Sequence, residues 1–352
     1  MNRIYSSLSA LIFLASCATQ KPAVQEGEVA RIIKTLSSDE MEGRAIFTPG
    51  IDRAARFIEE EFEKIGLKPL DGDNDFRQDF KVFNIKPGVI TARIDGQTIQ
   101  AENVFAVSDN AVLNFKSESN VQVVSLTATD QFIQKYREYS TLKTPTLVLV
   151  DQQHAGIFKR VKDGSSRGRT VTKLSDTPGV VFILGTKEAK DFDISISTTK
   201  EEKALFNVAG MLPGKSKEKE LVLFSSHYDH LGVGKPVEGD SIFNGADDNA
   251  SGTTAVIELA RYYKKLNKNE RTLIFVAFTG EESGGFGARY FSSELKPDDV
   301  TAMFNIEMIG KESKFGKNAA FITGYERSDF GDILQRNLAD TDFTFHPDPY
   351  PD

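Results

Sequence analysis

The chain has 352 residues, of which 39% are hydrophobic and 27% are charged. That content can bury one large core or two smaller ones, and it excludes a disordered chain. The formal net charge is −8 at pH 7, and the basic residues are scattered among acidic ones. Because binding to nucleic acid needs a basic surface, we expect no nucleic-acid partner.

The first residues have the pattern of an export signal. Arg3 is followed by an apolar stretch from Leu8 to Ala15, which is too short to span a bilayer. The segment Leu14-Ala15-Ser16-Cys17 resembles a bacterial lipobox, in which the cysteine is lipidated after cleavage in front of it. An ordinary signal peptide with a chance cysteine is the alternative.

We therefore expect a lipoprotein signal peptide at residues 1–17 and a polar tether at residues 18–28. The lipid on Cys17 would hold the protein at the membrane of a bacterial cell envelope, at the outer membrane or on the periplasmic face. Cys17 is the only cysteine, so the chain has no internal disulfide and no further thiolate for catalysis or metal binding.

Residues 29–80 are predicted to begin the main domain with two helices. The better marked one starts at Thr48-Pro49, carries one apolar stripe and ends at Gly66. Between residues 81 and 204 the pattern changes to short β-rich runs, which predicts a largely β insert. Within it, the segment from Lys159 to Arg169 is expected to be a solvated loop.

Residues 205–352 return to the main domain, where strands and helices alternate. The predicted strands are Leu221–Phe224, Thr272–Phe278 and Thr301–Ile306, and a helical pattern follows each of the first two. This alternation predicts an α/β fold with a mostly parallel central sheet flanked by helices. In such sheets, ligands bind beyond the carboxyl ends of the strands.

Possible metal ligands gather at that edge of the predicted sheet. They are His227 and Asp229 after the first strand, Asp247 and Asp248 before the helix that follows, Glu281 and Glu282 after the second strand, and Glu307 after the third. An acidic residue in the first turn of a helix more often offsets the helix dipole. Their joint placement on one edge favours a site for divalent ions such as zinc.

These motifs resemble a known family. The order H-x-D, G-A-D-D-N-A-S-G, G-E-E and N-I-E-M-I-G resembles the di-zinc aminopeptidases and related exopeptidases of peptidase family M28. The segment Asp39–Arg44 is also similar to that family's N-terminal part, and the insert resembles a degenerate protease-associated domain. The resemblance implies a metallopeptidase with two Zn²⁺ per chain and a peptide substrate, most simply an aminopeptidase.

The resemblance also implies a role for each residue. His227 and Glu307 would bind one zinc, Glu282 would bind the other, and Asp247 would bind both. Glu281 would be the general base, and Asp229 would orient His227. A cis peptide bond would follow Asp247. A general base takes a proton from the attacking water and returns it to the leaving amine.

Two departures from the family pattern affect these expectations. Glu307 stands where the family has aspartate. The family's last histidine ligand would lie beyond Asp352, so we expect the sequence to be truncated at its C-terminus and to be a poor or inactive catalyst in this form. His346 does not match that motif, and His230 is expected to be a pocket residue rather than a ligand.

Two other functions stay open on sequence grounds. A glutaminyl-cyclase-like enzyme would use a single zinc on a similar scaffold. A binding module could also keep the fold without catalysis. The bridging-site sequence and the pair Glu281-Glu282 fit two metals better than one. Intact His227, Asp247 and Glu282 argue against a binding module for the full-length protein.

Overall fold

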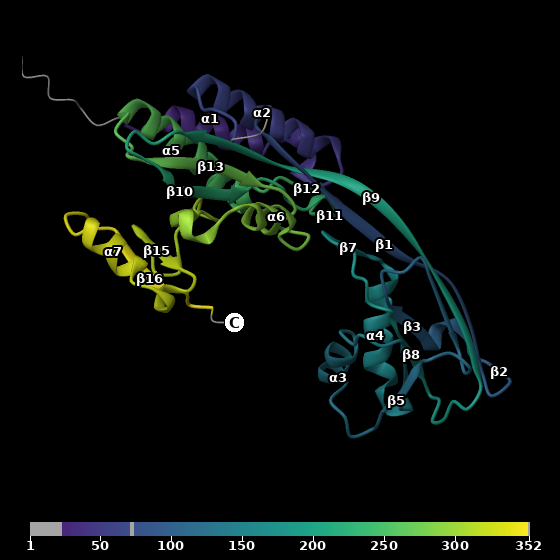
Figure 1. The fold of residues 1–352 in the computed structure, drawn as a ribbon. Coiled ribbons are helices and arrows are strands. Elements are labelled where there is room, and N and C mark those ends of the chain that lie inside the picture. Colours follow the sequence, from purple (N-terminus) through teal and green to yellow (C-terminus); the bar gives the residue numbers. More distant parts are fainter. Residues whose placement is uncertain (1–22, 71–73, 351–352) are drawn as a thin grey trace, which may run out of the picture.

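The computed structural model describes residues 23–70 and 74–350 (Figure 1). The predicted signal peptide with Cys17 lies outside the described residues. Among the described residues, no helix has the length and apolar character that crossing a membrane requires.

Two helices open the described chain, as the sequence predicts. They are α1 (Glu26–Leu36) and α2 (Pro49–Ile65), joined by the short helix η1 (Asp39–Arg44). Proline suits the first turn of α2, where its missing N–H is not needed. Gly66 ends α2 in a left-handed conformation with φ of 77°, which glycine adopts at little cost. The apolar stripe of α2 is fully buried at Ala54, Ile58 and Phe62.

The central sheet has the strand order β14-β10-β13-β9-β1-β2. Its strands β10 (Lys217–His227), β13 (Arg271–Phe278) and β14 (Val300–Asn305) run parallel. Helix α5 (Gly252–Leu266) follows β10, and α6 (Phe286–Glu294) follows β13. The predicted α/β fold is thus confirmed, and the carboxyl ends of these three strands meet at one edge.

The helices cover both faces of this sheet. On one face, α1, α2 and α5 pack against strand residues such as Phe224 and Phe275. On the other face, Phe291 of α6 packs against Ile274 and Val276. Because neighbouring residues of a strand point to opposite faces, one apolar run in β13 serves both cores. Figure 1 shows α1, α2 and α5 above the sheet and α6 below it.

A long antiparallel ribbon leads from the central sheet to the insert. It consists of β1 (Arg77–Ile94) and β9 (Phe192–Leu212), paired from Arg77 with Val208 to Ile94 with Phe192. Strand β9 continues into the central sheet, where it pairs antiparallel with β13. The predicted limits of the insert, residues 81 and 204, both fall inside this ribbon, which has no break at either point.

The insert has a four-stranded sheet of its own, in the order β3-β8-β6-β5. These strands are β5 (Gln122–Leu126), β6 (Thr146–Val150), β8 (Val180–Leu184) and β3 (Val104–Val107), with helices α3 (Phe132–Tyr139) and α4 (Ala155–Ser166). The insert contains the strands that the sequence led us to expect, together with helices that the sequence did not indicate. The expected loop at Lys159–Arg169 was wrong, because α4 runs to Ser166 and buries Phe158 in the insert's core.

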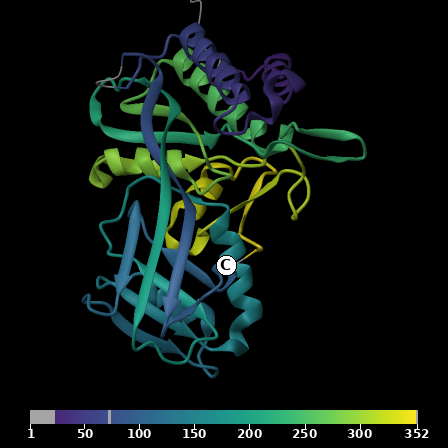
Figure 2. The same ribbon diagram turned by 90° about the vertical axis from the view of Figure 1, so that its right-hand side faces the viewer.

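The remaining elements are short. Strands β2 (Gln97–Thr98), β4 (Val112–Lys116) and β7 (Arg169–Val171) pair with the ribbon, and a hairpin of β11 (Gly232–Val237) and β12 (Asp240–Phe243) extends away from the body (Figure 2). The C-terminal segment has β15 (Ala319–Ile322), α7 (Phe330–Asn337) and β16 (Thr344–Pro347). Short helical turns are η2 (Ala101–Asn103), η3 (Gln152–His154), η4 (Ala246–Ser251), η5 (Pro297–Asp299) and η6 (Tyr325–Arg327).

Candidate metal centre

The predicted site residues lie at the carboxyl edge of the parallel strands. His227 is the last residue of β10, and the turn η4 leads into α5. Glu281 and Glu282 follow β13, and Glu307 follows β14. Because the three strands are parallel and adjacent, their loops converge although His227 and Glu307 are 80 positions apart in sequence.

One group of possible ligands consists of His227, Asp248 and Glu307. One ligand atom from each lies within 4.8 Å of the others, and His227 Nε2 is 3.1 Å from Asp248 Oδ1. Both of these atoms are buried, and neither has a hydrogen-bond partner among the described residues. Buried polar atoms are normally paired, so these two atoms are placed as ligands of a cation would be.

A second group consists of His230, Asp248 and Glu282, again with ligand atoms within 4.8 Å of one another. His230 Nδ1 lies 2.7 Å from Glu282 Oε1 and 3.9 Å from Asp248 Oδ2. Asp248 therefore belongs to both groups. Its Oδ1 faces His227 and its Oδ2 faces His230, the arrangement expected of a carboxylate shared by two cations.

Asp247 lies elsewhere, although the family resemblance implied the shared position for it. Its Oδ1 accepts a hydrogen bond of 2.9 Å from the backbone N–H of Gly310, and its Oδ2 is 3.4 Å from Nζ of Lys311. The geometry brings Asp248 to the centre in its place. The expected position of the cis peptide bond was also wrong by one residue: the bond joins Asp248 to Asn249.

The backbone fixes the orientation of His227. Its Nδ1 is 3.1 Å from the carbonyl oxygen of Asp229. When Nδ1 carries the proton and donates it to that carbonyl, Nε2 keeps its lone pair for a cation. The side chain of His227 is only 3% exposed, so the ring has little freedom to turn.

The carboxylate of Asp229 contacts the glutamates more closely than it contacts His227. Its two oxygens accept the backbone N–H groups of Glu281 at 3.1 Å and Glu282 at 3.3 Å, whereas its Oδ1 is 3.8 Å from His227 Nδ1. Burial raises the pKa of Asp229 to about 6, while His227 and those N–H groups lower it. Asp229 therefore positions the loop that carries both glutamates.

The two glutamates differ in exposure. The side chain of Glu281 is 48% exposed, and its Oε2 lies 4.0 Å from His227 Nε2. The side chain of Glu282 is 21% exposed and contacts His230. Glu281 thus borders the centre with an accessible carboxylate, whereas Glu282 is part of it.

Glu307 is more exposed than His227 and Asp248, the other members of its group. Burial raises the pKa of its carboxyl group, the charge of His227 lowers it, and the neighbouring carboxylates raise it further. Asn249, which is fully buried, holds the loop on both sides of Glu307: it donates to the carbonyl of Ile306 at 3.0 Å and accepts from the N–H of Met308 at 3.3 Å. The sequence had not indicated this role for Asn249.

The donor set suits zinc. Each group offers one imidazole nitrogen and two carboxylates, which are ordinary zinc ligands, and no thiolate is involved. His230, which the sequence placed beside the ligands, supplies the nitrogen of the second group. The spacing H-x-D-H was the signal that could have suggested it.

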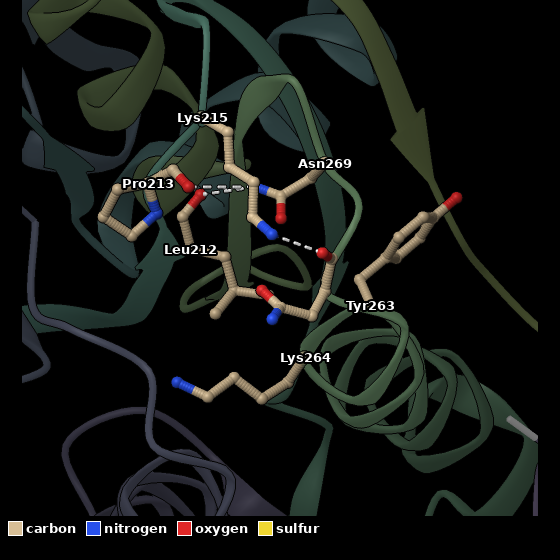
Figure 3. Close-up of a pocket in the computed structure, with 7 residues that line it drawn as sticks. Leu212, Pro213, Lys215, Tyr263, Lys264 and Asn269 are labelled. Carbon is tan, nitrogen blue, oxygen red and sulfur yellow. Dashed lines mark hydrogen bonds between the residues drawn. The ribbon is translucent and has the colours of Figure 1, made fainter. Parts of the chain in front are cut away.

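The main domain also has a hollow away from this centre. It measures about 370 Å³ and is lined by residues that include Leu212, Tyr263 and Asn269 (Figure 3). Leu212 pairs with Leu273 near the start of β13, so the hollow lies at the opposite edge of the sheet. Several of its polar groups are bonded to one another: Lys215 Nζ donates to the carbonyl of Asn267, and Asn269 Nδ2 donates to that of Pro213.

Comparison with known proteins bears on this arrangement. Residues 207–352 match the model of a family described as peptidase family M28. This part of the chain is therefore similar to peptidase family M28. The matched M28 region contains every member of both ligand groups, but the helices α1 and α2 lie outside it.

Individual relatives align over shorter stretches. A vacuolar membrane protease of Schizosaccharomyces pombe is 35% identical over 108 residues, which are 31% of this chain and 12% of that protein. A protein of Arthroderma otae named "Probable leucine aminopeptidase" is 33% identical over 112 residues, 30% of this chain and 29% of that protein. A solved zinc aminopeptidase from Bacillus subtilis has 15% identity and a TM-score of 0.49, covering 93% of this chain and 81% of its own. The chain thus spans well under half the length of these two curated relatives.

Proposed function

We propose that the protein is a zinc exopeptidase, most simply an aminopeptidase, whose centre takes two zinc ions. The observation that carries the proposal is the position of Asp248. One of its oxygens faces His227 and the other faces His230, and each histidine group is completed by a glutamate. In this assignment Asp248, rather than Asp247, is the shared ligand.

The chain's own residues prepare the centre for hydrolysis. Zinc bound there would supply Lewis acidity to a water and to the peptide carbonyl. His227 keeps Nε2 unprotonated because Nδ1 faces the carbonyl of Asp229. Glu281, the accessible carboxylate at the edge of the centre, is the residue we assign as general base: it takes the proton of the attacking water and delivers it to the leaving amine.

The preference for N-terminal bonds rests on the relative from Arthroderma otae, which is named a leucine aminopeptidase. A free α-amino group carries a positive charge, which suits a centre rich in carboxylates. We therefore expect the protein to cleave amino-acid anilides and to leave the same compounds uncleaved when their amine is acetylated.

Metal content and turnover test the proposal together. Because His230 completes the second ligand group, we no longer expect this form of the chain to be inactive. Purified protein loaded with zinc and freed of excess ion is expected to hold two zinc ions per chain and to hydrolyse amino-acid anilides. The variant His227→Ala is expected to lose at least one ion and the activity. His154→Ala is the matched control, since His154 lies in the insert and should leave both readings unchanged.

The results separate the peptidase from the two alternatives. One zinc per chain together with cyclisation of an N-terminal glutamine would favour a glutaminyl-cyclase-like enzyme. Two zinc ions without turnover of any free-amine substrate would favour a binding module. Protein that retains no zinc after loading would refute a zinc centre altogether.

We also propose that lipid on Cys17 anchors the protein to the envelope membrane, because Leu14-Ala15-Ser16-Cys17 has the pattern of a lipobox. A single acyl chain binds membranes only weakly, and stable anchoring needs a second signal such as another chain. The full-length protein should fractionate with membranes, and Cys17→Ser should release it. Membrane association that survives this substitution would contradict the proposal.

A further inference from the structure

Arg44 is a fully buried arginine at the end of η1, outside the matched M28 region. Among the residues that the structure describes, its guanidinium donates only to backbone carbonyls. The acceptors are those of Leu36 at 2.5 Å, Tyr228 at 2.8 Å, Asn244 at 2.6 Å and Gly245 at 2.9 Å. Its own backbone carbonyl accepts the N–H of His230 at 3.2 Å.

All of these partners except Leu36 belong to the two loops that carry the histidines and the shared aspartate. Tyr228 lies directly after His227, and Gly245 leads into the turn that contains Asp248. Gly245 has φ of 59°, and a Cβ atom there would lie 2.6 Å from Arg44 Nη2 and 2.2 Å from the carbonyl oxygen of Asp248. The loop is therefore packed directly against the guanidinium, with no space for a side chain.

The charge of Arg44 is also unusually placed. Within the described parts of the chain, no carboxylate is close enough to form an ion pair with it. Burial lowers its pKa to about 10, while the carboxylates of Asp229, Asp248 and Glu282 raise it. Arg44 is thus a cation at neutral pH. A buried cation without an ion-pair partner is costly to maintain, and here the four carbonyls and the acidic centre compensate that cost.

A simpler interpretation is that Arg44 only joins α1 to the rest of the protein, since it also contacts Leu36 at the end of α1. Three of its four acceptors, however, lie in the ligand-bearing loops. A guanidinium presents five donors in a fixed plane, whereas an ammonium group presents three on a flexible stem. The four acceptors use that planar geometry, which lysine cannot reproduce.

We propose that Arg44 is a positioning residue for the metal centre. Its guanidinium fixes the distance between the loop of His227 and His230 and the loop of Asp248. At that distance the carboxylate of Asp248 can serve both ligand groups. This proposal rests on the proposed zinc function. It extends that function to a residue of the N-terminal segment that, among the described residues, makes no hydrogen bond to a ligand side chain.

The test compares Arg44→Lys and Arg44→Met with Arg261→Met. Arg261 is the control because it also makes several bonds from a largely buried position, to Glu61 and Glu258, but contacts neither ligand loop. Zinc affinity is measured by competition with a chelator, at a temperature where thermal unfolding shows each variant to be folded. Both Arg44 variants should bind zinc about 10–100-fold more weakly, the usual effect of losing a residue that supports a ligand. Arg261→Met should unfold at a lower temperature and keep its zinc affinity.

A second measurement does not need metal. In metal-free protein, amide hydrogen exchange of residues 227–230 and 244–248 should be faster in Arg44→Lys than in the unchanged protein. In Arg261→Met, exchange should rise in α1, α2 and α5 instead. This reading remains valid if Arg44→Met fails to fold or if the unchanged protein binds no zinc, a result that would refute the proposed function but not the positioning role.

Three results would overturn the inference. Unchanged zinc affinity in both Arg44 variants would show that the loops hold their positions without the guanidinium. Normal affinity in Arg44→Lys with weak binding in Arg44→Met would show that charge, not geometry, is what matters. Unchanged hydrogen exchange in the two loops would show that Arg44 only joins α1 to the protein.

Discussion

The adjacent aspartates give the sharpest test of the metal centre. Asp248→Asn removes the negative charge of a carboxylate whose two oxygens face His227 and His230. The amide N–H₂ of the new asparagine would place a hydrogen-bond donor in one of the two ligand groups. Both ions would lose an anionic ligand. Loss of a residue that only supports a ligand weakens metal binding by up to roughly 100-fold. We expect the affinity for each zinc ion to fall by more than that.

Asp247→Asn is the matched control, with the same chemical change one residue earlier. The new amide oxygen can still accept the N–H of Gly310, so the loss is confined to the ion pair with Lys311. That lysine side chain is 76% exposed, and an exposed ion pair contributes about 1 kcal/mol at most, equivalent to about fivefold in affinity.

The assay is zinc competition with a chelator, combined with elemental analysis of the two variants after removal of free ion. Asp247→Asn should keep two zinc ions, and Asp248→Asn should keep neither after the same treatment. If Asp247→Asn loses zinc as completely as Asp248→Asn, or if Asp248→Asn retains both ions, then the shared position has been assigned to the wrong aspartate.

Three further predictions follow from contacts in the structure. Glu281→Gln should lower turnover by about 10²–10⁴-fold, the usual contribution of a general base, and leave the zinc content unchanged. Glu282→Gln should lower the zinc content instead. The reverse pattern would mean that the roles of the two glutamates are exchanged. His230→Ala should reduce bound zinc from two ions to one by elemental analysis, and two remaining ions would exclude His230 as a ligand. Glu61→Gln should lower the free energy of unfolding at pH 7 by about 1–3 kcal/mol without changing zinc affinity, and denaturant titrations that show no loss would contradict it.

The pH dependence of the Glu61 effect has a definite sign. The Glu61 side chain is 1% exposed and accepts from Arg31 at 2.8 Å and Arg261 at 2.9 Å. Burial raises the pKa of Glu61, but hydrogen bonds from Arg31, Lys64 and Arg261 lower it below the ordinary 4.5. A carboxyl group with a lowered folded-state pKa contributes stability above the unfolded pKa and loses it as the pH falls. The difference between the unchanged protein and Glu61→Gln should therefore shrink below pH 4.5.

The sequence predicted where the centre lies because strand ends are local features. Each of three residues, His227, Glu282 and Glu307, follows a buried apolar run. That pattern is enough to place them at one edge of a parallel sheet. The α/β class followed from the same alternation of strands and helices. These predictions needed only the order of elements along the chain.

The choice between Asp247 and Asp248 was beyond the sequence. Both aspartates lie in one turn, and which side chain faces His227 depends on backbone angles that residue types do not determine. The same holds for His230, whose contact with Glu282 depends on how the loop turns after β10. In the insert, α4 was missed because the polar residues of Lys159–Arg169 hid the helical spacing of Ile157, Phe158 and Val161, which pack in the insert's core.

The loops of the centre are connected to one another by side chains rather than by each loop's own structure. Asp229 in the loop after β10 holds the N–H groups of Glu281 and Glu282. Asn249, in the turn before α5, holds the backbone on both sides of Glu307. Such supporting contacts preorganise ligands for a metal.

These cross-connections imply that each ligand depends on a residue from another loop. Asn249→Ala, for example, removes no ligand, yet it leaves the carbonyl of Ile306 and the N–H of Met308 without their partner. Glu307 would then move with its loop, and the group that contains His227 should bind zinc more weakly, while the group that contains His230 should be affected less.

An equal loss of affinity for both ions would instead mean that the shared carboxylate of Asp248, which precedes Asn249, had been displaced. Measuring the two zinc affinities separately in this variant distinguishes these outcomes, because stepwise competition resolves a strong ion from a weak one. Full retention of both affinities would show that β14 alone suffices to position Glu307.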